Sequence, residues 1–283
     1  MDSGGAVVPV HGDLGAATSA VVLLVHGYAN SANAARESWT AFLQGIADET
    51  VGGWQPRVVG VQWPGDEPLP VLNQASYPSK IGVARESAAC VAEWLRSANG
   101  PGGAPMTISI VAHSLGCRLA VELLERIADD PGAYNVVVDR VVLMAGAVPT
   151  VRVDAGHELR DGAEFPHGTC ALFSEGDDVL RIAFPIGETA GGDGFFPTAV
   201  GRHGGPGSTW TAAQQMAHSA GGLYGHSDYW PGREAARAAA AFLRLVVLAQ
   251  PLARGLDAVA PPEPNVIGER TLASRALPVN VIH

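Results

Sequence analysis

Five short apolar runs, rich in β-branched residues, set the main constraint on how this chain folds. They cover residues 19–26, 57–63, 106–113, 136–146 and 169–176. Each run is continuous rather than alternating, as is typical of a strand covered on both faces. Stretches with apolar residues three and four apart predict helices at 35–49, 81–98 and 114–130. Because strand and helix alternate, we expect an α/β fold: a doubly wound, mostly parallel sheet with helices on both faces.

The length of the chain favours a single domain. An α/β domain can reach 283 residues without splitting, so we expect one domain over 1–283 with its core between residues 19 and 250. A last long helix is predicted over 232–250, and the tail over 251–283 is expected to be extended or to add a small strand. The proline-rich segment 64–81 and the glycine-rich segment 185–222 fit the alternation poorly. We interpret them as loop excursions that serve as a cap or lid, or as plain surface loops.

Charge and hydropathy exclude several classes of partner. The chain has 18 basic and 28 acidic residues, and the net charge of −10 repels phosphate backbones and anionic lipid surfaces. We therefore expect no nucleic-acid partner. No apolar run reaches the roughly 20 residues that span a bilayer, so we expect no membrane span. Oligomeric state is not indicated by the sequence.

Cysteine usage and the first residues bear on the cellular compartment. The three cysteines, Cys90, Cys117 and Cys170, are odd in number and form no C-x-x-C pair. Neither a disulfide framework nor a zinc cluster is indicated. Asp2 stands where an export signal has a basic region, and Pro9 interrupts the apolar residues that follow. We therefore expect no export signal and a cytoplasmic protein with reduced thiols.

The stretch "AHSLG" joins a predicted strand to a predicted helix. Its central residue is Ser114, with the small residues Ala112 and Gly116 two positions to either side. A sharp strand-to-helix turn of this kind holds a serine at its tip with the hydroxyl exposed, and it needs small flanking residues. Glycine is usual at both flanking positions, so Ala112 is a small departure. The pattern predicts Ser114 as a nucleophile, and Cys117, one helical turn on, as a small buried residue.

A serine nucleophile needs a base, and the base needs a carboxylate to fix its tautomer. The fifth predicted strand ends in Asp177 and Asp178. We favour Asp177 because its spacing from the following apolar pair places it on the turn. Asp178 is the first alternative and Asp154 a more distant one. Both adjacent aspartates are also typical of helix N-terminal carboxylates, which is the structural alternative.

Nine histidines compete for the role of base. His226 follows the candidate acids and lies just before the last long helix, in the loop-like stretch "YGHSDYW". It is therefore the predicted base. His218 and His203 lie in or near the glycine-rich segment and are weaker candidates.

Attack on a carbonyl also needs N–H donors for the oxyanion. In "VHGYANS", Gly27 permits a tight turn after the first strand, so the backbone N–H of Tyr28 is a candidate donor. The N–H of Leu115, at the start of the helix after the serine, is the second candidate. His26 is expected to have a structural role in this loop.

The stretches "VHGYANS", "AHSLG", "SEGDDVL" and "GHSDYW" together resemble the four signatures of the α/β-hydrolase superfamily, over residues 19–250. The resemblance implies Ser114 as nucleophile, Asp177 as acid and His226 as base, in that chain order. It also implies oxyanion donors at Tyr28 and Leu115. More narrowly, "VHGY" with "QWPGD" and the late "GHSDYW" is similar to a set of bacterial hydrolases, a likeness that implies no particular substrate.

We therefore expect a serine hydrolase that cleaves a small-molecule carboxylic ester or thioester through an acyl-enzyme, without a metal or organic cofactor. An acyltransferase that uses the same three residues is one alternative. A hydrolase-fold binding protein without activity is another, because a fold does not settle function. A metal-dependent hydrolase built on His203 and Asp193 is disfavoured, because no H-E-x-x-H or similar spacing occurs.

Overall fold

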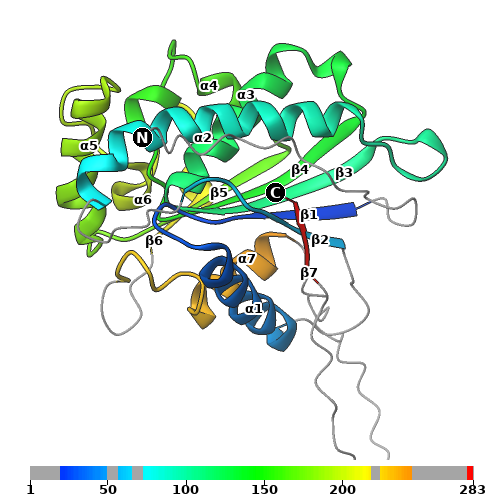
Figure 1. Cartoon of the computed structure of the whole chain (residues 1–283), viewed down its shortest axis with the longest axis horizontal. Helices are drawn as coiled ribbons and strands as arrows, with labels where there is room; N and C mark the ends of the chain where they lie inside the picture. The colour runs from blue at the N-terminus through cyan, green and yellow to red at the C-terminus, as the bar shows by residue number, and fades with distance from the viewer. Residues whose placement is uncertain (1–19, 50–56, 66–72, 218–223, 244–278, 283) are drawn as a thin grey trace, which may run out of the picture.

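The computed structural model describes residues 20–49, 57–65, 73–217, 224–243 and 279–282. Seven strands form one sheet in the order β6-β5-β4-β3-β1-β2-β7 (Figure 1). Every neighbouring pair is parallel. The strands are β1 Ala20–Val25, β2 Arg57–Val61, β3 Met106–His113, β4 Val136–Met144, β5 Gly168–Phe173, β6 Gln215–Ala217 and β7 Val279–Ile282.

Helices cover both faces of this sheet. Figure 1 shows α2, α3 and α4 on one face and α1 with α7 on the other. The helices are α1 Ala32–Glu49, α2 Asn73–Arg96, α3 Leu115–Asp129, α4 Arg160–Glu164, α5 Phe184–Gly191, α6 Val200–His203 and α7 Arg233–Phe242. Short turns of 3-10 helix are η2 Pro101–Gly103, η3 Pro131–Ala133, η4 Thr150–Val153 and η6 Ala212–Gln214, and η5 Val179–Ala183 is a turn of π-helix. The predicted doubly wound α/β fold is confirmed.

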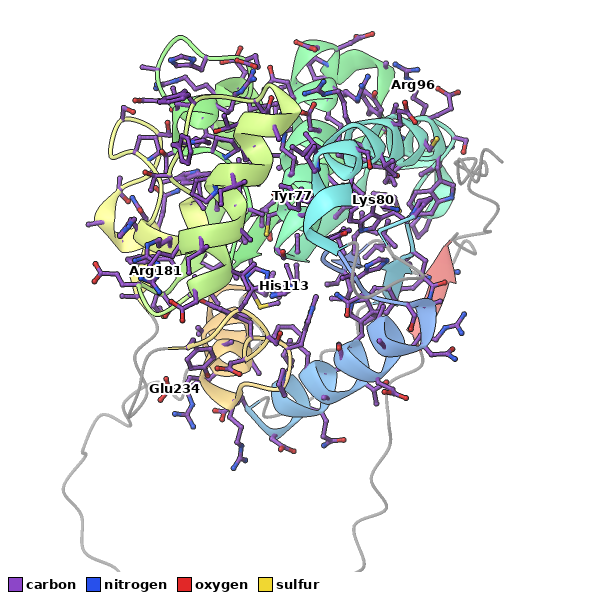
Figure 2. All side chains as sticks on the ribbon, turned by 60° about the vertical axis from the view of Figure 1, so that its left-hand side comes forward. Tyr77, Lys80, Arg96, His113, Arg181 and Glu234 are labelled. Carbon is purple, nitrogen blue, oxygen red and sulfur yellow. The ribbon has the colours of Figure 1, made fainter. Side chains whose placement is uncertain are left out.

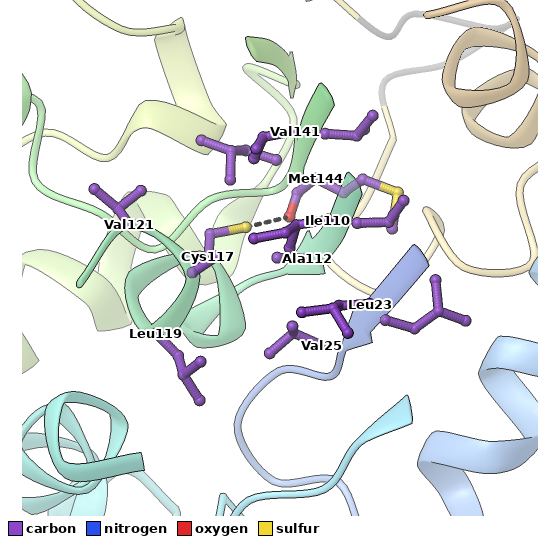
Figure 3. Close-up of a cluster of buried hydrophobic side chains, with 14 of the residues drawn as sticks. Leu23, Val25, Ile110, Ala112, Cys117, Leu119, Val121, Val141 and Met144 are labelled. Carbon is purple, nitrogen blue, oxygen red and sulfur yellow. Dashed lines mark hydrogen bonds between the residues drawn. The ribbon is translucent and has the colours of Figure 1, made fainter. Parts of the chain in front are cut away.

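The central strands form as the sequence predicts because both of their faces are buried. The last five residues of β1 and the last four of β3 are buried without interruption. Around the junction of β3 and α3, Figure 3 shows apolar side chains of the strands packing against the inner face of the helix. Cys117 is part of this core, with its Sγ 3.5 Å from the carbonyl oxygen of Met144. Burial raises the pKa of the Cys117 thiol, so this residue behaves as the predicted small buried side chain.

The first predicted excursion is wrong in its second half, where residues 73–81 are helical. The helix α2 begins at Asn73, although Pro78 lies five residues inside it. The hydroxyl of Tyr77 donates to Oε1 of Glu188 in α5, at 2.9 Å. Pro78 has no backbone N–H, so α2 lacks one of its helical hydrogen bonds near this point. The contact between Tyr77 and Glu188 offsets this loss by tying the first turns of α2 to α5. Residues 66–72 lie outside the described residues.

The second predicted excursion, 185–222, is also not a loop without structure. Its residues form most of α5, then α6, η6 and the edge strand β6, which pairs with β5 from Ala171↔Gln215 to Phe173↔Ala217. Residues 218–222 lie outside the described residues. The glycines of this segment cap short helices and do not prevent them from forming. Helix α5 ends at Gly191, and the next residue, Gly192, caps it in the left-handed conformation with a φ of 76°.

The C-terminal tail adds a strand, which is one of the two expected outcomes. Strand β7 pairs in parallel with β2, from Val58↔Val279 to Val61↔Ile282. Residues 244–278, which include the end of the predicted last helix, lie outside the described residues. Across the described parts of the chain, no helix has the length and apolarity needed to cross a bilayer.

Candidate active site

Ser114 lies at the junction of β3 and α3 in an unusual backbone conformation. Its φ is 55° and its ψ is −127°, and such a positive φ is rare and strained for a residue other than glycine. Two glycines allow this turn to pack closely against the end of β1. A Cβ on Gly116 would overlap the carbonyl oxygen of His26, and a Cβ on Gly27 would lie 2.8 Å from the Cβ of Ser114. The sharp turn that the sequence predicts is therefore present, and Ala112 fits it as a fully buried residue.

Three side chains from separate loops converge at this turn. Nε2 of His226 lies 2.7 Å from Oγ of Ser114, and Nδ1 of His226 lies 2.7 Å from Oδ2 of Asp177. Asp177 is fully buried, and its Oδ1 accepts a hydrogen bond from the backbone N–H of Leu180 at 2.9 Å. Since a carboxylate only accepts, Nδ1 of His226 donates to Asp177, and Nε2 is left to accept from the Ser114 hydroxyl. The arrangement can take a proton from Ser114.

The alternative acids lie elsewhere. Asp178 is exposed, and its carboxylate accepts a hydrogen bond of 2.9 Å from Nε of Arg181. Asp154 accepts from the hydroxyl of Ser208 at 2.5 Å and is not brought to Ser114. Of these three aspartates, the structure brings only Asp177 to the imidazole of His226.

The alternative bases do not reach the site either. His203 is exposed on α6, with its Nδ1 3.8 Å from Oε1 of Glu175. His218 lies outside the described residues. Within the described parts of the chain, no three His, Cys, Asp or Glu side chains gather as a metal site. Asp193, the other residue considered for a metal, pairs with Arg118 and Arg152 instead.

The turn after β1 lies beside Ser114. His26 is buried, with its ring stacked on Trp63 at a centroid distance of 5.6 Å, and its carbonyl oxygen accepts from Nε1 of Trp63 at 2.9 Å. These contacts give His26 the structural role that we expected. Tyr28 lines the same pocket as Ser114, and Leu115 is the first residue of α3. One oxyanion candidate thus lines the pocket of Ser114, and the other follows Ser114 directly in the chain.

His113, which the sequence analysis did not single out, contacts the loop that carries the imidazole. Its Nε2 lies 2.8 Å from the carbonyl oxygen of His226. Burial, and after it the nearby His226, lower the pKa of His113 from its ordinary value of 6.5 to about 3, so the ring is neutral. Nε2 therefore carries the proton and donates to that carbonyl. Figure 2 shows His113 between Tyr77 and the orange segment that holds α7.

A cavity of about 360 Å³ opens onto the Ser114 hydroxyl. Its polar groups include Ser114, His113 and His226, and most of the rest of its wall is aromatic or aliphatic. The larger apolar residues of the wall are Tyr28, Tyr77, Val179, Leu180 and Phe184. A mostly apolar pocket with a few convergent polar groups is the usual form of a small-molecule site.

Comparison with family models identifies the family of the chain. The family described as "Alpha/beta hydrolase of unknown function (DUF900)" matches residues 11–188, which include Ser114 and Asp177. No curated protein matches the chain. Among solved structures, acyl-protein thioesterase 2 of Zea mays is similar at 17% identity and a TM-score of 0.34, over 77% of this chain and 90% of that one.

Proposed function

Because the chain belongs to the alpha/beta hydrolase family DUF900, we propose that it is a serine hydrolase that cleaves a carboxylic ester or thioester through an acyl-enzyme. One observation carries the proposal: the hydrogen-bonded series from Ser114 through His226 to Asp177, with both distances at 2.7 Å. A hydroxyl, an imidazole and a buried carboxylate in this order are the parts that nucleophilic acyl transfer requires.

In the first half of the proposed reaction, Nε2 of His226 takes the proton of the Ser114 hydroxyl. Oγ then bonds to the carbonyl carbon of the substrate, and the carbonyl oxygen becomes an oxyanion. When the intermediate collapses, the bond to the alkoxide or thiolate breaks, and His226 returns its proton to that leaving group. Asp177 orients the imidazole throughout and stabilises its positive charge.

In the second half, water replaces the leaving group. His226 takes a proton from the water molecule, the resulting hydroxide adds to the acyl carbon, and the bond to Oγ of Ser114 breaks. The proton passes back to Oγ, which releases the carboxylic acid and restores the enzyme. No metal or organic cofactor takes part in this scheme.

The backbone N–H groups of Tyr28 and Leu115 are our proposed donors to the oxyanion. Their positions support this role: Tyr28 lines the pocket beside the hydroxyl, and Leu115 begins the helix that follows it. A donor of this kind typically contributes about 3 kcal/mol to the transition state. The N-terminus of α3 adds the positive end of a helix dipole.

The test is a panel of p-nitrophenyl esters and acyl thioesters of increasing chain length, assayed with the wild type and Ser114→Ala. We expect hydrolysis by the wild type and a loss of several orders of magnitude in kcat for Ser114→Ala, with circular dichroism unchanged. Adding an alcohol to the assay tests the acyltransferase alternative, because the acyl group would then pass to the alcohol as well as to water. Full activity in Ser114→Ala, or no activity of the folded wild type on the panel, would contradict the proposal.

A further inference from the structure

The surface segment from residue 182 to residue 201 presents no charged side chain to solvent. It has only two charged residues, Glu188 and Asp193, and both are buried. Phe184 and Val200 are buried, but four other large apolar side chains point outward: Ile182, Ile186 and Phe196 are more than half exposed, and Phe195 is 86% exposed. A surface element normally buries its apolar residues and exposes its charges. We call residues 182–201 the inverted segment.

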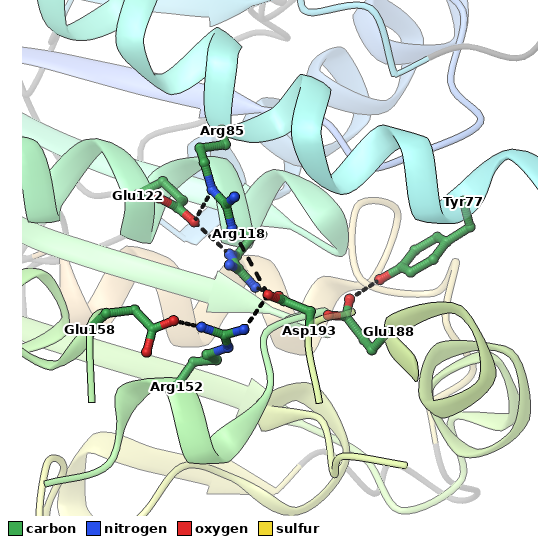
Figure 4. Close-up of polar contacts among 8 residues, drawn as sticks. All are labelled: Tyr77, Arg85, Arg118, Glu122, Arg152, Glu158, Glu188 and Asp193. Carbon is green, nitrogen blue, oxygen red and sulfur yellow. Dashed lines mark hydrogen bonds and ion pairs between the residues drawn. The ribbon is translucent and has the colours of Figure 1, made fainter. Parts of the chain in front are cut away.

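Buried polar contacts, an ion-pair cluster at Asp193 and a hydrogen bond at Glu188, hold the inverted segment in this orientation. Asp193 pairs with Arg118, which is itself buried, and lies 2.5 Å from Nη2 of Arg152 (Figure 4). Glu188 accepts the hydroxyl of Tyr77. Removing one partner of a buried pair leaves an uncompensated charge, which is costly, so these contacts fix which face of the segment points outward.

Five of the exposed large apolar side chains lie on η5, on α5 and in the turn that follows α5: Val179, Ile182, Ile186, Phe195 and Phe196. The first three follow one another at helical spacing along η5 and α5. The backbone N–H of Phe196 donates to Oγ1 of Thr189 at 2.8 Å, which brings the two phenylalanines to the end of α5. Phe196 has a φ of 46°, a strained value for a bulky residue, and its ring contacts that of Phe195 at 5.1 Å. We call these five residues the apolar patch.

The apolar patch begins at the entrance of the pocket that holds Ser114. Three residues of the pocket wall are exposed and mark this entrance: Ala29, Val179 and Ser227. Val179 is 46% exposed and belongs to both the wall and the patch. A ligand that leaves the pocket beside Val179 therefore meets apolar side chains, with the exposed ion pair of Asp178 and Arg181 at their border.

We propose that the apolar patch docks on the surface of a zwitterionic lipid layer, with Phe195 and Phe196 entering its apolar boundary. Large exposed apolar patches mark interaction sites, and aromatic side chains are typical of helices that bind at a membrane surface. The net charge of −10 disfavours anionic lipid, and the inverted segment exposes no charged side chain that would lose hydration at the apolar boundary of a zwitterionic layer. A protein or a second copy seated on Val179 would cover the pocket entrance. A lipid layer would instead supply an acyl substrate through it, and this last step rests on the proposed function.

Co-sedimentation of the full chain with phosphatidylcholine vesicles tests the docking without reference to catalysis. The test variant is Phe195→Ser with Phe196→Ser, and the control is Met216→Ser, because Met216 is 44% exposed on β6 outside the patch. Burying one such ring contributes about 1.5–3 kcal/mol. We therefore expect the wild type and the control to bind, and the double variant to lose at least tenfold in partition coefficient. Binding should survive high salt, since it is not electrostatic.

Four results would overturn the docking proposal. They are no binding of the wild type, equal binding of the double variant, binding only to phosphatidylglycerol vesicles, and a wild-type dimer in sedimentation velocity that the double variant abolishes. Ser114→Ala should bind vesicles like the wild type. A short soluble ester should be hydrolysed equally by the wild type and the double variant. Failure of docking is therefore distinguished from failure of the proposed function.

Discussion

His113 holds the loop that carries His226, and its replacement by leucine tests this contact. Nε2 of His113 donates to the carbonyl oxygen of His226 at 2.8 Å, and the imidazole of His226 in turn contacts Ser114. Leucine fills similar space but cannot donate. The carbonyl would then lose its partner in a buried environment, which costs about 1–3 kcal/mol.

The loop that carries His226 has two ways to respond. If it stays in place, the cost appears as a lower free energy of unfolding. If it moves to find another donor, the imidazole shifts from Ser114, and the same free energy corresponds to a rate loss of about 5- to 150-fold. His113→Gln restores a donor close to the position of Nε2 and should recover much of the wild-type rate.

The assay is the second-order rate of inactivation by a fluorophosphonate, measured beside urea unfolding of each variant. This rate reports on the Ser114 nucleophile and its base without a turnover step. A loss of rate in His113→Leu, with recovery in His113→Gln, identifies His113 as a positioning residue. A His113→Leu variant with the wild-type rate and the wild-type free energy of unfolding would show that this hydrogen bond neither positions the loop nor stabilises the fold.

Three further predictions concern the turn, the buried acid and the choice of carboxylate. A Cβ at residue 116 would overlap the backbone of His26, so Gly116→Ala should lower the free energy of unfolding by about 1–3 kcal/mol in urea titrations. Burial raises the pKa of Glu188 from its ordinary value of 4.5 to about 8, so the folded state holds this proton more tightly. The free energy of unfolding of the wild type should then fall as the pH rises from about 4.5 to 8. In Glu188→Gln the free energy of unfolding, measured by urea titration at several pH values in this range, should not show this fall. Asp178→Asn should keep ester hydrolysis close to the wild-type rate, whereas Asp177→Asn should lose it, and the reverse order would assign the acid to Asp178.

Most of the sheet could be predicted because its strands are buried on both faces. The five predicted strands begin within one residue of β1 to β5 in the structure. The turn at Ser114 could be predicted for a related reason: only small residues fit beside it, and Ala112 and Gly116 are visible in the sequence. Local patterns are sufficient where burial or steric fit dictates the residue type.

Two segments could not be predicted because contacts from far along the chain decide them. The prolines before residue 81 favour a loop, yet Tyr77 contacts Glu188, which is 111 residues away, and the helix extends back to Asn73. In the inverted segment, a helical pattern predicts that apolar residues face the core and charged residues face solvent. Ile186 is exposed and Glu188 is buried, which is the reverse. The partner of His113 is a backbone carbonyl 113 residues away, which no sequence pattern indicates.

Whether Ser114 is the nucleophile is measured by mapping the site of fluorophosphonate modification with mass spectrometry. We expect one adduct per chain on the peptide that contains Ser114, formed rapidly in the wild type and slowly in His226→Ala. Ser114→Ala should form none. An adduct on a different residue, or none on the folded wild type, would show that Ser114 is not the nucleophile.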